Sequence, residues 1–245
     1  MDNSERCFLD WMTLQKRDSE ELLQALTITD DGDPNTLFAE LVEKNMTHFQ
    51  EYIDRRTQLA VERPCTYFAP TWSSSLENSL LWLAGYRPSV YIRLLYSLCG
   101  SYVETLISEY LDRGARTGNL GELSAQQMHK INDLHCRIIK REEQLTNKQA
   151  SLQEEMADDP VSVIAKEHRD ARESYEQVQS NIQKYEGAMF GILQEADNLR
   201  LTTLKELVSI LTPLQAVDFL AADKKLHLCL HEWGKRRDAL QGRTN

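Results

Sequence analysis

Residues 69–100, APTWSSSLENSLLWLAGYRPSVYIRLLYSLCG, form the most apolar and aromatic stretch of an otherwise charged chain. The Gly-x-Arg-Pro-Ser sequence in its middle interrupts any helix, because proline lacks an amide hydrogen and clashes with the preceding turn. Leucine and aromatic residues recur at spacings of three and four on both sides of the break, as they do in amphipathic helices. We therefore expect two buried helices, 74–85 and 88–113, joined at a tight corner on which the other helices pack.

The rest of the chain predicts more helices and no alternating strand pattern. Helical spacing of apolar residues covers 5–27, 34–63, 124–157, 186–211 and 213–234, whereas 161–185 reads as a solvated helix or a partly disordered segment. The expected fold class is all-α. It is one helical-bundle domain, residues 1–234, of about seven to eight helices with a long central helix, followed by a basic flexible tail, 235–245.

Three of these helices begin with capping-box sequences, in which a Ser or Thr and a Glu or Gln three residues later bond each other's amide groups. The pairs are Ser74 with Glu77, Ser124 with Gln127, and Thr212 with Gln215. Glycine ends helices readily in a left-handed conformation, so Gly85 and Gly234 are expected to terminate the helices that precede them.

The charge and cysteine content narrow the class of protein. The net charge is −10, whereas a free-standing DNA-binding protein needs a basic face to neutralise phosphates. The best basic cluster is local and consists of Lys224, Lys225, Lys235, Arg236 and Arg237, which also resembles a two-part nuclear import signal. Five scattered cysteines without a CxxC pair argue against a disulfide framework. We expect a protein of the nucleus or the cytoplasm, without a signal peptide, membrane span or direct DNA binding.

No catalytic motif is present: the sequence has no phosphate-binding glycine loop, GxSxG or HExxH, so we do not expect an enzyme. The sharpest candidate site is His227 with His231. Residues four apart share one helical face, and imidazole is the commonest metal ligand. Two histidines on one face cannot grip opposite sides of one haem, so a haem would take one of them as an axial ligand. The alternative is two polar residues on the outer face of a helix.

A second candidate is the N-terminal run of residues 6–11, RCFLDW. An aromatic stripe exposed near a chain end suits a helix that docks into a partner's groove. The alternative, packing on the bundle, is equally compatible with the sequence.

Several segments carry a family resemblance: YFAPTW at 67–72, WLxGxRPS at 82–89, EADNLR at 195–200 and KKLHLxxHEWG at 224–234. Together they resemble the delay-of-germination domain, a plant helical domain that also follows the basic zipper of TGA-type transcription factors. The corner residues Trp82, Gly85, Arg87, Pro88 and Ser89 belong to this pattern and are expected to be structural, with Arg87 bonding nearby carbonyls or acids.

The resemblance implies a regulator of seed dormancy and germination that acts in abscisic acid signalling. It implies binding and restraint of clade A type-2C protein phosphatases through Phe8, Leu9, Asp10 and Trp11, where Arg6 replaces an acidic residue of the family motif. It also implies haem binding by His227 and His231, and a homodimer as in the TGA relatives. The alternative is a TGA-like transcription cofactor, but no basic zipper precedes the domain in this sequence.

Overall fold

The computed structural model describes residues 2–27, 34–112, 120–158 and 171–242. These ranges form seven α-helices and two 3-10 helices, with no strand among them, which confirms the all-α prediction. The elements are α1 (Asn3–Ala25), α2 (Pro34–Ala60), η1 (Pro64–Tyr67), α3 (Ser75–Leu80), α4 (Ser89–Asp112), η2 (Leu120–Glu122), α5 (Ala125–Met156), α7 (Ala171–Ile210) and α8 (Pro213–Leu240).

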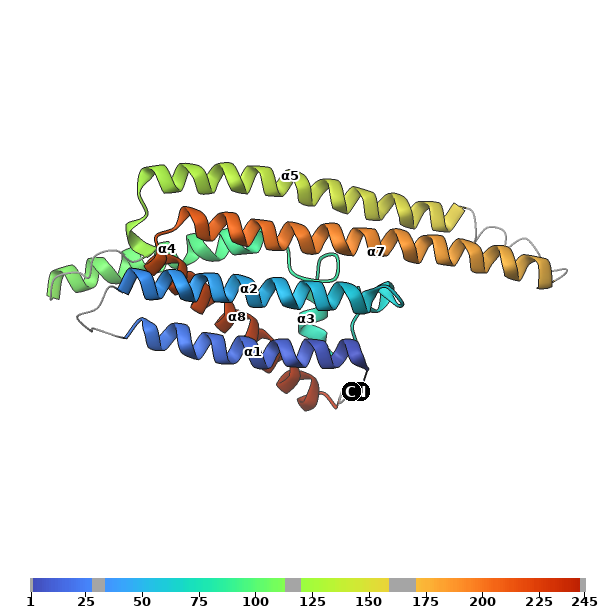
Figure 1. Ribbon diagram of the computed structural model, residues 1–245, viewed down its shortest axis with the longest axis horizontal. Helices are drawn as coiled ribbons and strands as arrows, with labels where there is room; N and C mark the ends of the chain where they lie inside the picture. The colour runs from blue at the N-terminus through green and yellow to red at the C-terminus, as the bar shows by residue number, and fades with distance from the viewer. Residues whose placement is uncertain (1, 28–33, 113–119, 159–170, 243–245) are drawn as a thin grey trace.

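The 40-residue helix α7 is the central element of the bundle. It lies between α5 and α2, and α1 packs on the far side of α2 (Figure 1). These four helices run along the long axis, whereas α8 crosses α1 and α2 obliquely. Because α8 contacts α1, α2 and α3 at once, it ties the two ends of the chain to the corner between α3 and α4.

The core follows the apolar stripes of the sequence. Ile131, Leu134, Ile138 and Leu145 of α5 are all buried, and Leu152, which continues the same stripe, is half-buried. Each fully buried leucine or isoleucine contributes about 1.5–3 kcal/mol relative to an exposed one. The three predicted capping boxes are all formed.

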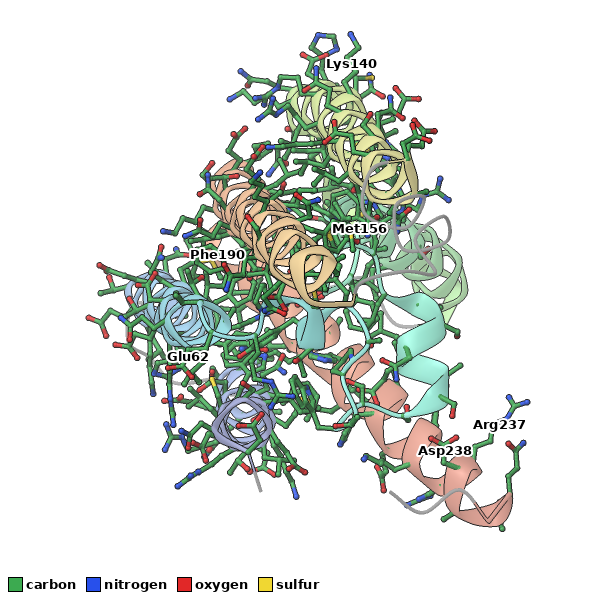
Figure 2. The ribbon with its side chains drawn as sticks, turned by 90° about the vertical axis from the view of Figure 1, so that its right-hand side faces the viewer. Glu62, Lys140, Met156, Phe190, Arg237 and Asp238 are labelled. Atoms are coloured by element: carbon green, nitrogen blue, oxygen red, sulfur yellow. The ribbon has the colours of Figure 1, made fainter. Side chains whose placement is uncertain are left out.

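Two expected boundaries are wrong, and one open alternative is decided. The helix after Ser74 ends at Leu80 and does not reach Gly85. Of the two alternatives for 161–185, the helix is confirmed for 171–185, which continues without a break into the helix predicted for 186–211, while 161–170 lie outside the described residues. The last helix runs past Gly234 to Leu240, so residues 235–240 of the expected flexible tail are helical. Figure 2 shows this end of α8, with Arg237 and Asp238, extending beyond α1 and α2.

Gly234 has a different role from the predicted helix stop. A Cβ at this position would lie 2.0 Å from Ser74 Oγ, so the absence of a side chain lets α8 cross directly over the first residues of α3. The amide of Ser75 then donates to Asp238 Oδ2 at 2.8 Å. This crossing places the histidines of α8 beside the cap of α3.

Candidate functional site

The corner between α3 and α4 is a tight turn over residues 82–85. Trp82 and Gly85 exchange two backbone hydrogen bonds, of 2.6 and 3.2 Å. The central residues Leu83 and Ala84 have φ values of 47° and 64°, which non-glycine residues adopt at a cost of about 1–3 kcal/mol each. The surrounding structure must therefore hold this turn in place.

Two buried arginines hold it by binding its carbonyl groups. Arg200 donates to the carbonyl oxygens of Trp82, Leu83 and Tyr86 at 2.5–2.8 Å, and Arg56 donates to that of Ala84. Both guanidinium groups also pair with the buried carboxylate of Asp197.

Gly85 is required here for space and not for a left-handed conformation. A Cβ at Gly85 would lie 2.7 Å from Arg200 Cζ, and among the described residues outside glycine only Leu83 and Ala84 have positive φ. The expectation that Gly85 ends a helix in a left-handed conformation is therefore wrong. The residues that occupy that conformation are its two predecessors.

The start of α4 is fixed by a single acid of α5, Glu142. Its carboxylate accepts from the Ser89 amide at 2.7 Å and from Ser89 Oγ at 3.1 Å, and it pairs with Arg87 at 3.3 Å. Pro88 directly precedes the first residue of α4. The expected bond between Arg87 and an acid is confirmed, although no local pattern indicates that Glu142 is that acid.

His231 faces the capping acid of α3. Its Nδ1 lies 2.9 Å from Glu77 Oε1, while the other carboxylate oxygen of Glu77 accepts from the amide and hydroxyl of Ser74. Burial alone would raise the pKa of Glu77, but the hydrogen bonds from His231 and Ser74 outweigh it and hold this pKa below its usual range. Since an ionised carboxylate only accepts hydrogen bonds, Nδ1 of His231 carries a proton and Nε2 is the atom available to a ligand.

His227, one turn earlier, lies in a less polar setting. Burial lowers the pKa of His227 to about 4, so its ring is neutral at physiological pH. Gln15 Nε2 lies 2.9 Å and Gln15 Oε1 3.3 Å from its Nδ1, so the amide can donate to this nitrogen or accept from it, according to the tautomer of the ring. The edge of the Tyr86 ring contacts the imidazole, with centroids 5.4 Å apart.

The N-terminal run divides between core and surface. Phe8 and Trp11 are buried, at 9% and 6% exposure. Trp11 stacks on Tyr52 with ring centroids 4.6 Å apart, and Phe8 meets His231 edge-on at 5.5 Å. Leu9 is 37% exposed, and Asp10 forms an exposed ion pair of 3.0 Å with Arg55 of α2. The folded domain thus presents Leu9 and Asp10 on its surface and keeps the two aromatic residues inside.

Lys224 departs from its predicted place in an exposed basic cluster. It is 4% exposed, pairs with the fully buried Asp18 at 3.3 Å, and its Nζ lies 5.2 Å from the centre of the Trp11 ring. Asp18 also contacts His48 at 3.0 Å, a histidine that looked isolated in the sequence. A two-part import signal that includes Lys224 is therefore not accessible in the folded chain.

A cavity of about 150 Å³ lies between α1, α2, α8 and the corner. Its lining includes Trp11, Gln15, Tyr86 and His227. The volume is below the roughly 300–1,000 Å³ of ordinary ligand pockets, so the cavity does not fit an enclosed porphyrin, and His231 is not among its lining residues.

Other site types find little support within the described ranges. No group of three or more His, Cys, Asp or Glu side chains there could hold a metal ion. None of the described helices has the length and apolar character needed to cross a membrane. The five cysteines are free thiols.

Known proteins similar to this chain were found by comparison. A family model described as "Seed dormancy control" matches residues 18–97. Protein DOG1-like 3 of Arabidopsis thaliana is 42% identical over 238 residues, which cover 95% of this chain and 84% of that protein. Protein DOG1-like 1 of the same plant is 39% identical, with coverage of 95% and 89%. Transcription factor TGA6 is 26% identical over 94% of this chain but only 61% of its own length.

Proposed function

Since the chain belongs to the DOG1 family of seed dormancy control proteins, we propose that it is a non-enzymatic regulator of seed dormancy and germination. In this proposal it binds clade A type-2C protein phosphatases and restrains their activity in abscisic acid signalling. A more distant relative, 24% identical over 94% of both chains, is named Protein RESPONSE TO ABA AND SALT 1, which agrees with a role near abscisic acid.

The observation that carries the phosphatase proposal is the exposed edge of α1. Leu9 offers an apolar contact at 37% exposure, and Asp10 with Arg55 offers a charged pair beside it. Phe8 and Trp11 contribute indirectly, because their burial fixes the rotation of α1 that turns Leu9 and Asp10 outward. The binding surface would then be formed by α1 and α2 together, and not by an aromatic helix that inserts into a groove.

The test compares two exposed leucines of the same helix. Leu9→Ala should weaken phosphatase binding about fivefold or more, as truncation of a central apolar contact does. Leu23→Ala is the matched control, since Leu23 is 44% exposed and lies more than three turns away on α1. Binding is measured by biolayer interferometry with an immobilised phosphatase. Equal affinities of the two variants would contradict the proposal.

Trp11→Ala is a poor probe of the same surface. Removing a buried tryptophan costs about 3–5 kcal/mol of folding free energy, and here it also removes the ring beneath Lys224. Its loss of binding would therefore reflect the loss of α1 packing.

We propose in addition that α8 binds haem, with His231 as the axial ligand. The support is the contact between Nδ1 and Glu77, because a carboxylate on one ring nitrogen orients the imidazole so that the other nitrogen can bind a metal. His227 is the second family histidine, but its Nδ1 contacts the neutral amide of Gln15 in place of a carboxylate, so its contribution is weaker. Haem, when bound, supplies an iron centre whose axial position takes an imidazole. The residues of this chain orient that imidazole and hold its proton on Nδ1.

The haem test uses single variants. His231→Ala should abolish the shift of the Soret band on titration with haemin, and His227→Ala should retain most of it. An unchanged spectrum for His231→Ala would refute the axial assignment. Glu77→Gln tests the orienting contact, since an amide no longer requires the proton on Nδ1, and an altered band position is expected.

The distant match to TGA6 supports a second candidate, a transcription cofactor in the nucleus. Lys225, Lys235, Arg236 and Arg237 are exposed and would serve an import signal without Lys224. We expect a homodimer and no direct DNA binding. A gel shift at low salt separates the candidates, because electrostatic attachment to DNA is strongest there. A salt-sensitive shift would favour the second candidate.

A further inference from the structure

Three residues that line the cavity between α1, α2, α8 and the corner each have a buried polar side-chain atom without a hydrogen-bond partner among the described residues. They are Asn45 with its Oδ1, Tyr86 with its hydroxyl, and Arg56 with its Nε, which lies in an ion pair 3.4 Å from Asp197 Oδ2. A buried polar atom without a partner is costly, and such atoms in native proteins call for an explanation. Neither the phosphatase surface nor the contact of His231 with Glu77 uses them.

The orientation of the Asn45 amide follows from its own helix. Its Nδ2 donates to the Leu41 carbonyl at 2.7 Å, so the reversed amide would bring two acceptors together. The residue is 1% exposed. The atom left without a partner is therefore Oδ1, an acceptor.

Tyr86 provides the complementary group. Burial raises the pKa of its phenol, so the hydroxyl keeps its proton and can donate. Its backbone is fixed because its carbonyl accepts from Arg200 at 2.7 Å. Tyr86 therefore presents a rigid donor to the same cavity.

The rest of the lining selects for a neutral ring. Aromatic side chains of Phe49, Tyr52 and Tyr91 are part of the wall. The buried cations are already paired, Arg56 and Arg200 with Asp197 and Lys224 with Asp18. Of the two carboxyl groups on the lining, Glu77 bonds Ser74 and His231, and burial raises the pKa of Asp223 toward the neutral form. A cavity of about 150 Å³ holds a benzene ring in another protein, which matches the volume found here.

The cavity also has a route to the surface. Val90 and the side chain of Arg87 line it and are 37% and 46% exposed, respectively. We propose that this cavity binds a small, neutral, monocyclic aromatic molecule that donates one hydrogen bond to Asn45 Oδ1 and accepts one from the Tyr86 hydroxyl. This site does not depend on phosphatase or haem binding.

The test uses two probes of the same shape, benzamide and acetophenone, titrated into the full chain and followed by saturation-transfer NMR. Benzamide has both a donor and an acceptor, whereas acetophenone has only the acceptor. We expect saturable benzamide binding with a dissociation constant of about 1 mM or tighter. Tyr86→Phe should weaken both probes about tenfold, and Asn45→Leu should weaken benzamide about tenfold and leave acetophenone unchanged.

Tyr96→Phe is the matched control, because Tyr96 of α4 packs on His135 of α5 outside the cavity. This variant should bind both probes like the wild type. Circular dichroism verifies that each variant is folded. Absence of saturable binding to folded wild-type protein would overturn the proposal, as would a crystal structure of the benzamide-soaked protein with only water in the cavity. An equal loss of both probes in Asn45→Leu would overturn the role of Asn45.

Discussion

Replacing Gly234 by alanine tests how closely α8 packs on the start of α3. An added Cβ would lie 2.0 Å from Ser74 Oγ and 2.7 Å from Ser74 Cβ. Ser74 is 1% exposed and exchanges hydrogen bonds with Glu77 in the capping box, so its side chain cannot rotate away without losing them. The two helices must therefore separate, and the contact between Glu77 and His231 is displaced with them.

The expected free energy has two opposing parts. Overpacking of this kind costs about 1–3 kcal/mol, whereas alanine favours a helix interior over glycine by about 1 kcal/mol. Gly234→Ala should thus lower the free energy of unfolding by roughly 0–2 kcal/mol. Gly191→Ala isolates the helix preference of alanine, because nothing lies within 4 Å of a Cβ at Gly191 in α7. This variant should raise the free energy of unfolding by about 1 kcal/mol.

Urea unfolding monitored by circular dichroism measures both variants. Their difference of about 1–3 kcal/mol is the cost of the close crossing, and for a chain of this size each kcal/mol moves Tm by about 2–4 °C. Ser74→Gly added to Gly234→Ala should recover most of the loss, since glycine at an N-cap costs only a few tenths of a kcal/mol. Equal stabilisation by Gly234→Ala and Gly191→Ala would refute the reasoning.

Two further predictions concern buried charges. Arg200→Lys should lower the free energy of unfolding, measured in urea, by about 2–4 kcal/mol, since an ammonium group cannot replace the planar guanidinium on three carbonyls. The control Arg137→Lys, at an exposed arginine paired with Glu206, should change this free energy by less than about 1 kcal/mol. Equal effects of the two variants would refute the role of Arg200. Burial raises the pKa of Asp223 to about 6 from about 3.9 in the unfolded chain. The folded state therefore binds more protons between these values, and this group's contribution to stability is lost as the pH rises through that window. Relative to the wild type, Asp223→Asn should therefore raise the free energy of unfolding by on the order of 2 kcal/mol more at pH 7 than at pH 4. A pH profile of urea unfolding equal to that of the wild type would contradict this prediction.

The parts of the fold that sequence predicts well are those set by neighbours along the chain. The capping boxes at Ser124 and Thr212 form as expected, because each bond joins residues only three apart. The apolar stripe of α5 is buried for a similar reason, since its spacing alone determines a helical face. For residues 6–11 the sequence is compatible with docking into a partner or with packing on the bundle, and burial of Trp11 shows that its side chain packs within the described domain.

The corner could not be predicted, because its conformation is imposed from far along the chain. The sequence places the only glycine of the turn at Gly85, yet the positive φ values fall on Leu83 and Ala84. The donors that hold this turn belong to Arg56 and Arg200 on α2 and α7. Local propensity disfavours the observed conformation, and long-range hydrogen bonds override it.

The basic pattern around Lys224 predicts an exposed side chain, and this prediction is wrong because a distant residue decides its surroundings. Lys224 stands next to Lys225 in a run that reads as a solvated face, but only the tertiary fold brings Asp18 to it. Burying an unpaired ammonium group would be prohibitive, whereas the pair with Asp18 and the Trp11 ring below it offset much of that cost.

The two chain ends and the corner are therefore one unit and not two functional surfaces on a separate scaffold. Gln15 of α1 contacts His227 of α8, whose ring meets Tyr86 of the corner. Phe8 of α1 contacts His231, which Glu77 of α3 orients. Phe8 is also the neighbour of Leu9. The haem ligand proposed on α8 and the phosphatase surface proposed on α1 are therefore joined by two contacts, that of Phe8 with His231 and that of Gln15 with His227.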